Sequence, residues 1–84
     1  MINTTFTRDP DLGECLTSPL DGKLYPGFIC DEEDFMQFFL NPDGTMWDGV
    51  DKYLHYSEKV ADNRVAVLFN DPAFADSVWD DLGK

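Results

Sequence analysis

The chain has 84 residues, of which 43% are apolar and 14% aromatic, so it can bury the core of one small domain. Seventeen acidic residues against six basic ones give a net charge of −11, beyond the magnitude of about 2–8 that suits a small soluble domain. This charge excludes direct binding to DNA, RNA or anionic lipid, which carry the same sign, and it favours a monomer that binds a basic protein.

Targeting and metal-binding patterns are absent from the sequence. The amino terminus has no basic region followed by an apolar stretch, and no apolar run approaches the roughly 20 residues of a membrane span. Cys15 and Cys30 are too few for a disulfide framework, and with His55 they form no zinc pattern. We expect a cytoplasmic protein with two free thiols and no cofactor or metal, and the start at Met1 favours a complete gene product.

The first third of the chain predicts strands and turns. Residues 2–8 alternate apolar or β-branched residues with polar ones, which is typical of a strand with one buried face made by Ile2, Thr4 and Phe6. Residues 9–13 predict a turn. Asp21-Gly22 predicts a hairpin between residues 16–20 and 23–25, which Pro19 and Pro26 would confine to a sheet edge.

The middle of the chain predicts two helices. In residues 31–40, acidic residues begin the helix, an apolar face follows, and Asn41-Pro42 ends it. Residues 41–49 predict a loop. Residues 49–62 place Val50, Tyr53, Leu54, Ser57 and Ala61 at helical spacing. The alternative is a strand with Val50, Lys52, Leu54 and Tyr56 on one face; we expect the helix.

The last part of the chain predicts a strand and a helix. Residues 65–69 are apolar throughout, which indicates a central strand buried on both faces. Asp71-Pro72 opens a helix whose inner stripe is Ala75, Val78, Trp79 and Leu82. The whole chain, residues 1–84, is therefore predicted to be a single acidic α+β domain with two or three short antiparallel strands and about three helices.

Three groups of acidic residues are candidate partner-binding sites. Asp76 and Asp80 lie one helical turn apart, about 6 Å along the axis, a spacing similar to that of successive phosphates, and Asp71 and Asp81 extend this group. The other two groups are Asp31, Glu32, Glu33 and Asp34, and Asp43, Asp48 and Asp51. Carboxylates on a rigid frame can occupy a basic groove built for nucleic acid. The alternative for each group is a solvated face with helix caps.

Other chemistry has weaker support in the sequence. The oxygen donors of residues 41–48 fail the calcium-loop pattern, because Met46 and Lys52 stand where glycine and glutamate are required. His55 could act as a general base with Asp51 or Glu58, but no nucleophile is placed beside it, and we expect it to face solvent from a helix. With no convergent nucleophile, base and oxyanion stabiliser, we predict no catalytic residues and no enzyme.

The chain has more aromatic residues than the predicted apolar stripes can bury. Trp47 and Tyr56 fall outside the clearest apolar stripes, so they are candidate exposed anchors for a protein partner. Tyrosine and tryptophan are frequent among the residues that dominate binding energy at protein interfaces.

In size and charge, across the whole chain and without aligned motifs, the protein resembles small acidic phage-encoded inhibitors such as anti-CRISPR, anti-restriction and DNA-glycosylase-inhibitor proteins. The resemblance implies an inhibitor that acts as a DNA or RNA mimic in the host cytoplasm and covers the nucleic-acid groove of a basic effector. One alternative is an acidic adaptor or regulatory domain that imitates no nucleic acid. Another is an ordinary domain of a halophile, whose acidity keeps it soluble.

Overall fold

The apolar run near the carboxyl end forms an interior strand that is paired on both sides and buried on both faces, as predicted. The computed structural model describes residues 2–48 and 50–82, and in it β5 (Arg64–Phe69) pairs with β3 (Leu24–Asp31) and β4 (Leu54–Ala61). Successive side chains of a strand point to opposite faces, so Val65, Val67 and Phe69 enter one core cluster and Ala66 and Leu68 another. Burial on both faces explains why the run has no polar residue.

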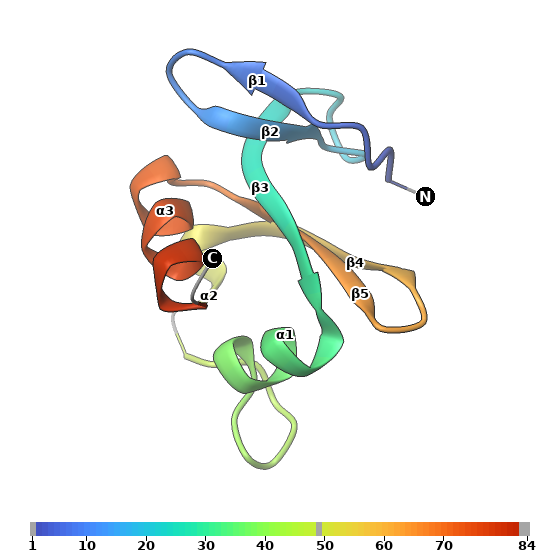
Figure 1. Ribbon diagram of the computed structural model, residues 1–84. Helices are drawn as coiled ribbons and strands as arrows, with labels where there is room; N and C mark the ends of the chain where they lie inside the picture. Colours follow the sequence, from blue (N-terminus) through green and yellow to red (C-terminus); the bar gives the residue numbers. More distant parts are fainter. Residues whose placement is uncertain (1, 49, 83–84) are drawn as a thin grey trace.

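The sheet has five antiparallel strands in the order β1-β2-β3-β5-β4, with β1 (Thr7–Asp9) and β2 (Gly13–Thr17) completing it (Figure 1). The helices are α1 (Glu32–Phe39) and α3 (Pro72–Asp81), and α2 (Val50–Tyr53) is a single turn. The prediction of two or three strands with about three helices is therefore wrong. Each face of β5 contributes to a separate core cluster. Forming both clusters takes more strand and less helix than we expected.

The largest error concerns residues 49–62, which form one helical turn followed by β4. Their apolar residues fit a period of 3.6 and a period of 2 about equally, and pairing with β5 decides between the two. Leu54 packs against one core cluster, whereas Tyr56 and Val60 pack against the other. The pairing of Ala61 with Arg64 leaves Asp62-Asn63 as a two-residue hairpin turn.

The hairpin at Asp21-Gly22 is confirmed, because β2 and β3 pair on either side of it and Gly22 has a positive φ of 75°. Its placement at a sheet edge is wrong, since β3 lies between β2 and β5. The register with β5 begins only at Gly27, so the missing N–H of Pro26 removes no bond from that ladder. A Cβ atom at Gly27 would collide with the carbonyl oxygen of Val67, which makes glycine necessary there.

The amino-terminal strand is shorter than predicted. Only Thr7–Asp9 of residues 2–8 pairs with a neighbour, and the turn that follows is present as expected. Ile2 is buried under the sheet, but Thr4 and Phe6 are exposed. The alternating pattern therefore marked an extended segment without a continuous buried face.

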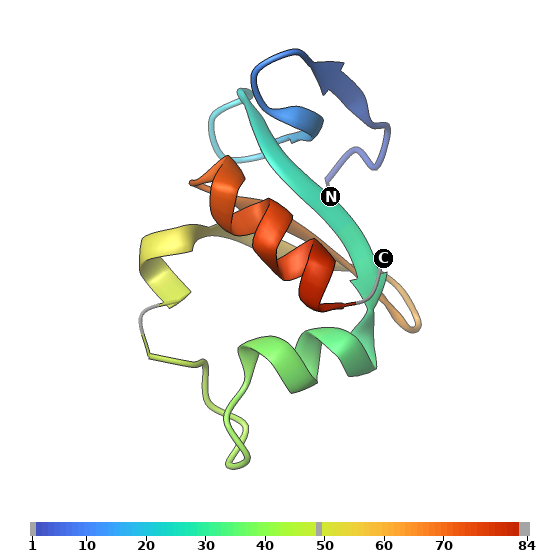
Figure 2. The same cartoon turned by 60° about the vertical axis from the view of Figure 1, so that its left-hand side comes forward.

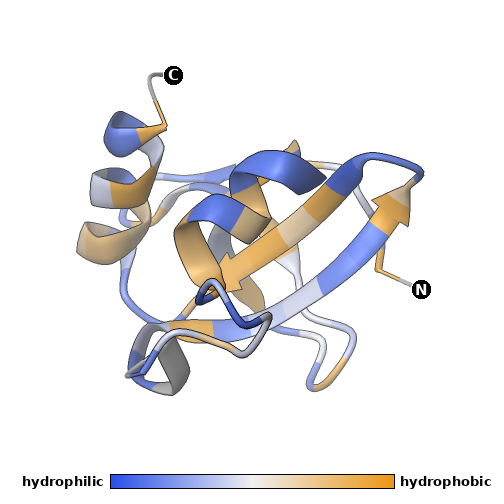
Figure 3. Ribbon diagram, turned by 90° about the horizontal axis from the view of Figure 1, so that it is seen from below, coloured by the Kyte–Doolittle hydropathy of each residue, from blue (hydrophilic) through white to orange (hydrophobic). Residues whose placement is uncertain are grey.

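Both longer helices agree with the sequence prediction, and both pack against β3 and β5 (Figure 2). Phe39 of α1 and Ala75 and Val78 of α3 enter the same core cluster. In Figure 3, hydrophobic and hydrophilic residues alternate along the helical ribbons, as expected for one buried and one exposed side. Within the described part of the chain, no helix has the length and apolar character needed to cross a membrane.

Candidate functional site

α3 carries the first predicted group of carboxylates on a well-anchored helix. The side chain of Asp71 accepts a hydrogen bond from the backbone N–H of Ala73 at 2.9 Å, and Pro72 occupies the first turn. These are strong helix-starting features. Ala75 and Val78 fix the inner side in the core, while Asp76, Asp80 and Asp81 are all exposed. Asp71 thus acts as a cap.

The structure brings two of these three aspartates to one side of α3. At 3.6 residues per turn, Asp76 and Asp80 differ by about 40° around the helix axis. Asp81 lies about 140° from Asp76 by the same geometry. Asp76 and Asp80 therefore form one charged edge, and Asp81 points in a different direction.

A hollow of about 330 Å³ lies beside this edge, between α3 and the β1–β2 hairpin; we call it the α3 groove. Its lining includes Asp76 and Trp79 from α3, and Arg8 and Glu14 from the hairpin. Trp79 packs against Phe28, with ring centroids 5.1 Å apart, yet 38% of its surface is exposed. The sequence prediction placed Trp79 on the inner stripe of the helix. This placement misses the exposed part of the ring, because helical periodicity cannot show that the neighbouring hairpin leaves part of the indole uncovered.

The charges on the hairpin side of the α3 groove largely neutralise each other. Arg8 Nη2 lies 3.2 Å from Glu14 Oε1, and both side chains are more than half exposed. Such an exposed ion pair contributes little to stability and is easily rearranged. Asp76 is the remaining carboxylate of the lining, so the groove has a net negative charge.

The acidic residues at the start of α1 have partners within the protein. Asp31 Oδ1 lies 2.8 Å from Arg64 Nη1, and Glu32 Oε2 lies 3.0 Å from Lys59 Nζ. Glu32, Glu33 and Asp34 also occupy the first helical turn, where negative charge is favoured by the helix dipole. Half of this predicted site is thus engaged in ion pairs within the protein, Asp31 across strands β3 and β5 and Glu32 between α1 and β4.

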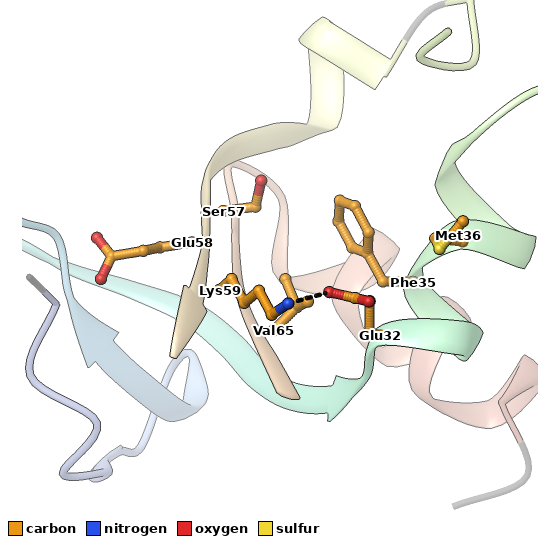
Figure 4. Close-up of a pocket in the computed structure, with 7 residues that line it drawn as sticks. All are labelled: Glu32, Phe35, Met36, Ser57, Glu58, Lys59 and Val65. Atoms are coloured by element: carbon orange, nitrogen blue, oxygen red, sulfur yellow. Dashed lines mark ion pairs between the residues drawn. The ribbon is translucent and has the colours of Figure 1, made fainter. Parts of the chain in front are cut away.

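A second hollow, of about 390 Å³, lies between α1 and β4. Figure 4 shows Lys59 and Glu32 reaching toward each other across it, while Glu58 points away. Phe35 and Val65 also line it, and Met36, which is 51% exposed, borders both this hollow and a shallow one of about 560 Å³ on the outer side of α1. The Lys59–Glu32 ion pair leaves this region less acidic than α3.

The two predicted aromatic anchors have different surroundings. Trp47 is 42% exposed, and its backbone N–H donates to the carbonyl of Phe39 at 2.8 Å, which attaches the loop to the end of α1. Tyr56 is half-buried, and its hydroxyl donates a short hydrogen bond to Glu58. This bond raises the pKa of Tyr56 and lowers that of Glu58. Trp47 is therefore accessible to a partner, whereas Tyr56 mainly packs beneath the sheet.

In the third acidic group, one carboxylate is engaged within its own loop. Asp43 accepts hydrogen bonds from the N–H and hydroxyl of Thr45 at 3.0 and 2.6 Å, which hold the loop turn and lower the pKa of the carboxyl. Asp48 is exposed, and the side chain of Asp51 lies outside the described residues. Among the side chains that the structure describes, no group of three or more histidine, cysteine or acidic residues is arranged to hold a metal.

His55 does not face solvent from a helix, so that prediction is wrong. Its Nε2 lies 2.8 Å from Ser18 Oγ, and its ring stacks on Tyr25 with centroids 3.7 Å apart. Tyr25 in turn donates to Asp21 at 2.6 Å, which raises the pKa of Tyr25 and lowers that of Asp21. The sheet curls enough for the β2–β3 turn to contact β4, a proximity that no sequence spacing predicts.

The Ser18–His55 pair has the atoms of a nucleophile and a base, but its hydroxyl is not accessible to a substrate. Ser18 is only 1% exposed, and its Oγ also accepts the N–H of Leu20 at 3.1 Å. Neither residue lines the hollows described above. A nucleophile must reach its substrate, and this hydroxyl instead holds the β2–β3 turn.

The two cysteines are free and buried. Burial raises the pKa of Cys30 to about 11, and burial followed by the charge of Asp9 raises that of Cys15. Both thiols therefore stay protonated near neutral pH, which makes them poor nucleophiles.

Comparison of the chain with protein-family models, with curated proteins and with solved structures found no match.

Proposed function

We propose that the protein is a small acidic inhibitor that binds the basic nucleic-acid-binding surface of a host protein, as a DNA or RNA mimic such as an anti-CRISPR or anti-restriction protein. The observation that carries this proposal is the surplus of surface carboxylates. The sequence has seventeen acidic and six basic residues. Within the described residues, three ion pairs engage Arg8, Lys59 and Arg64. Most carboxylates therefore remain available to an external cation.

The charged edge of α3 supports the proposal in geometric terms. Asp76 and Asp80 extend from a helix whose start is capped and whose inner side is packed in the core. Little backbone ordering is then needed when a basic partner binds, which reduces the entropic cost of association. Opposite charge would also speed the encounter and make it sensitive to salt.

The proposed partner is a basic, nucleic-acid-binding effector protein, and neither nucleic acid nor a membrane is bound directly. The inhibitor would act as a monomer in the cytoplasm, and in the host cytoplasm if it is encoded by a phage. Free thiols at Cys15 and Cys30 fit a reducing compartment. Binding, and no catalytic step, is the proposed activity.

The second candidate function is an acidic adaptor or regulatory domain that imitates no nucleic acid. Its support is the exposed apolar surface of Leu20 and Met36, in addition to Trp47. Such a domain would bind through apolar contact and would depend little on salt.

The test begins with capture of partners from a bacterial lysate on the immobilised protein, followed by identification and purification of each one. Binding is then measured at about 50 mM and about 500 mM salt, with and without duplex DNA. We expect a nucleic-acid-binding partner that is released by salt and competes with DNA. Asp76→Asn/Asp80→Asn should weaken it more than the charge-matched control Asp11→Asn/Asp62→Asn. A salt-resistant partner that ignores DNA would favour the adaptor instead.

A further inference from the structure

Trp79 is a partly exposed indole in a negatively charged hollow. It packs on Phe28 and still exposes 38% of its surface at the α3 groove. Asp76 lies three residues earlier on the same helix and lines the same hollow, so the carboxylate and the ring are neighbours on one helix face. An aromatic ring beside a carboxylate is a combination that suits a planar cation.

We propose that the α3 groove accepts an arginine side chain of the basic partner. The guanidinium group would stack on the indole of Trp79 and donate hydrogen bonds to the carboxylate of Asp76. This assignment rests on the proposed function, since it names how one cation of the partner is recognised. The groove, at about 330 Å³, is at the low end of small-ligand pockets, a size that suits one long side chain.

Charge and shape favour arginine over lysine at this position. The guanidinium is planar, stacks on aromatic rings and can donate two parallel hydrogen bonds to a carboxylate, whereas the ammonium of lysine is a compact, strongly hydrated charge. Arginine and tryptophan are also enriched among the residues that dominate interface binding energy. Stacking on the indole therefore favours a guanidinium over an ammonium group, whereas overall charge attraction does not distinguish the two.

Arg8 gives the groove an internal competitor. Arg8 lines the same hollow, and among the described residues its guanidinium pairs with Glu14 alone, at 3.2 Å and in an exposed position. A second guanidinium entering the groove would meet the positive charge of Arg8 as well as the negative charge of Asp76. Removal of Arg8 should therefore tighten binding of an arginine side chain.

The probe is an octaarginine peptide, compared with octalysine at about 150 mM salt so that long-range attraction is equally screened for both. A Trp47→Phe variant makes Trp79 the single tryptophan, so its fluorescence reports the groove directly. We expect octaarginine to change this fluorescence at several-fold lower concentration than octalysine. Trp79→Leu removes this reporter, so its binding is compared with that of the unsubstituted protein by titration calorimetry. The leucine keeps apolar packing on Phe28 and should weaken octaarginine binding by roughly 3- to 10-fold, whereas Arg8→Ala should strengthen it.

Asp76→Asn provides a second variant that leaves the packing of α3 intact, and Asp62→Asn is its control at a distant turn. Asp76→Asn should reduce the preference for arginine over lysine, while Asp62→Asn should not. Equal binding of both peptides, or octaarginine binding unchanged by Trp79→Leu and Asp76→Asn, would overturn the arginine site. If a captured partner still competed with DNA in that case, the proposed function would stand; a preserved arginine site without any such partner would reject the function alone.

Discussion

The contact between His55 and Ser18 should contribute a measurable part of the stability. Oγ of Ser18 accepts the N–H of Leu20 and forms a second hydrogen bond with Nε2 of His55, 2.8 Å away, whose direction is set by the tautomer of the imidazole. His55→Ala would leave this hydroxyl, in a residue that is 1% exposed, without its side-chain partner. An unsatisfied buried polar group costs about 1–3 kcal/mol, and the stacking of the imidazole on Tyr25 is lost as well.

The assay is urea unfolding at pH 7, and the free energy of unfolding of His55→Ala should fall by at least about 1 kcal/mol, with little change in the denaturant slope. Ser18→Ala and the double variant complete a double-mutant cycle. Because Ser18→Ala removes the hydroxyl that His55→Ala would orphan, the two losses should be non-additive by about 0.5–3 kcal/mol. Additive losses, or a single loss below about 0.5 kcal/mol, would refute a stabilising role for this contact.

Two further substitutions and one labelling experiment test other parts of the fold. Gly27→Ala should destabilise the protein by about 1–3 kcal/mol or more, measured by thermal unfolding, because the added methyl meets the backbone of Val67. Cys30, whose pKa burial raises to about 11, should react with a thiol reagent at pH 8 only after unfolding. Glu58→Gln should destabilise the protein near pH 7, because hydrogen bonds from Tyr56 and the N–H of Ile2 lower the pKa of Glu58. A lowered carboxyl pKa contributes stability above the ordinary value of 4.5 that is lost as pH falls, so the difference from the unsubstituted protein should shrink in acid.

Each of these expectations has a result that would contradict it. An unchanged melting temperature for Gly27→Ala would mean that β3 and β5 separate without cost at that point. Fast labelling of Cys30 in the native protein would contradict its burial. A Glu58→Gln deficit that stayed constant from pH 7 to well below pH 4 would show that the loss does not arise from the charge of this carboxylate.

Elements with a single consistent local pattern were predictable from the sequence. The run at residues 65–69 is apolar on both sides, and only a central strand buries both sides of so short a segment. The α3 helix follows from Asp71-Pro72 and the spacing of Ala75 and Val78, and the β2–β3 hairpin follows from Asp21-Gly22. The surplus of acidic residues, and with it the proposal of a basic partner, also comes from the sequence alone.

Tertiary contacts decided the rest of the fold and most of the site. Residues 54–61 fit a helix or a strand equally well, and β5 required a second pairing partner, which made them β4. The exposure of Trp79 and its position beside Arg8 depend on how the β1–β2 hairpin packs against α3. The contact of Ser18 with His55 spans 37 residues and forms only because the sheet curls. Local patterns report which side of a segment is buried, but not what another segment leaves uncovered.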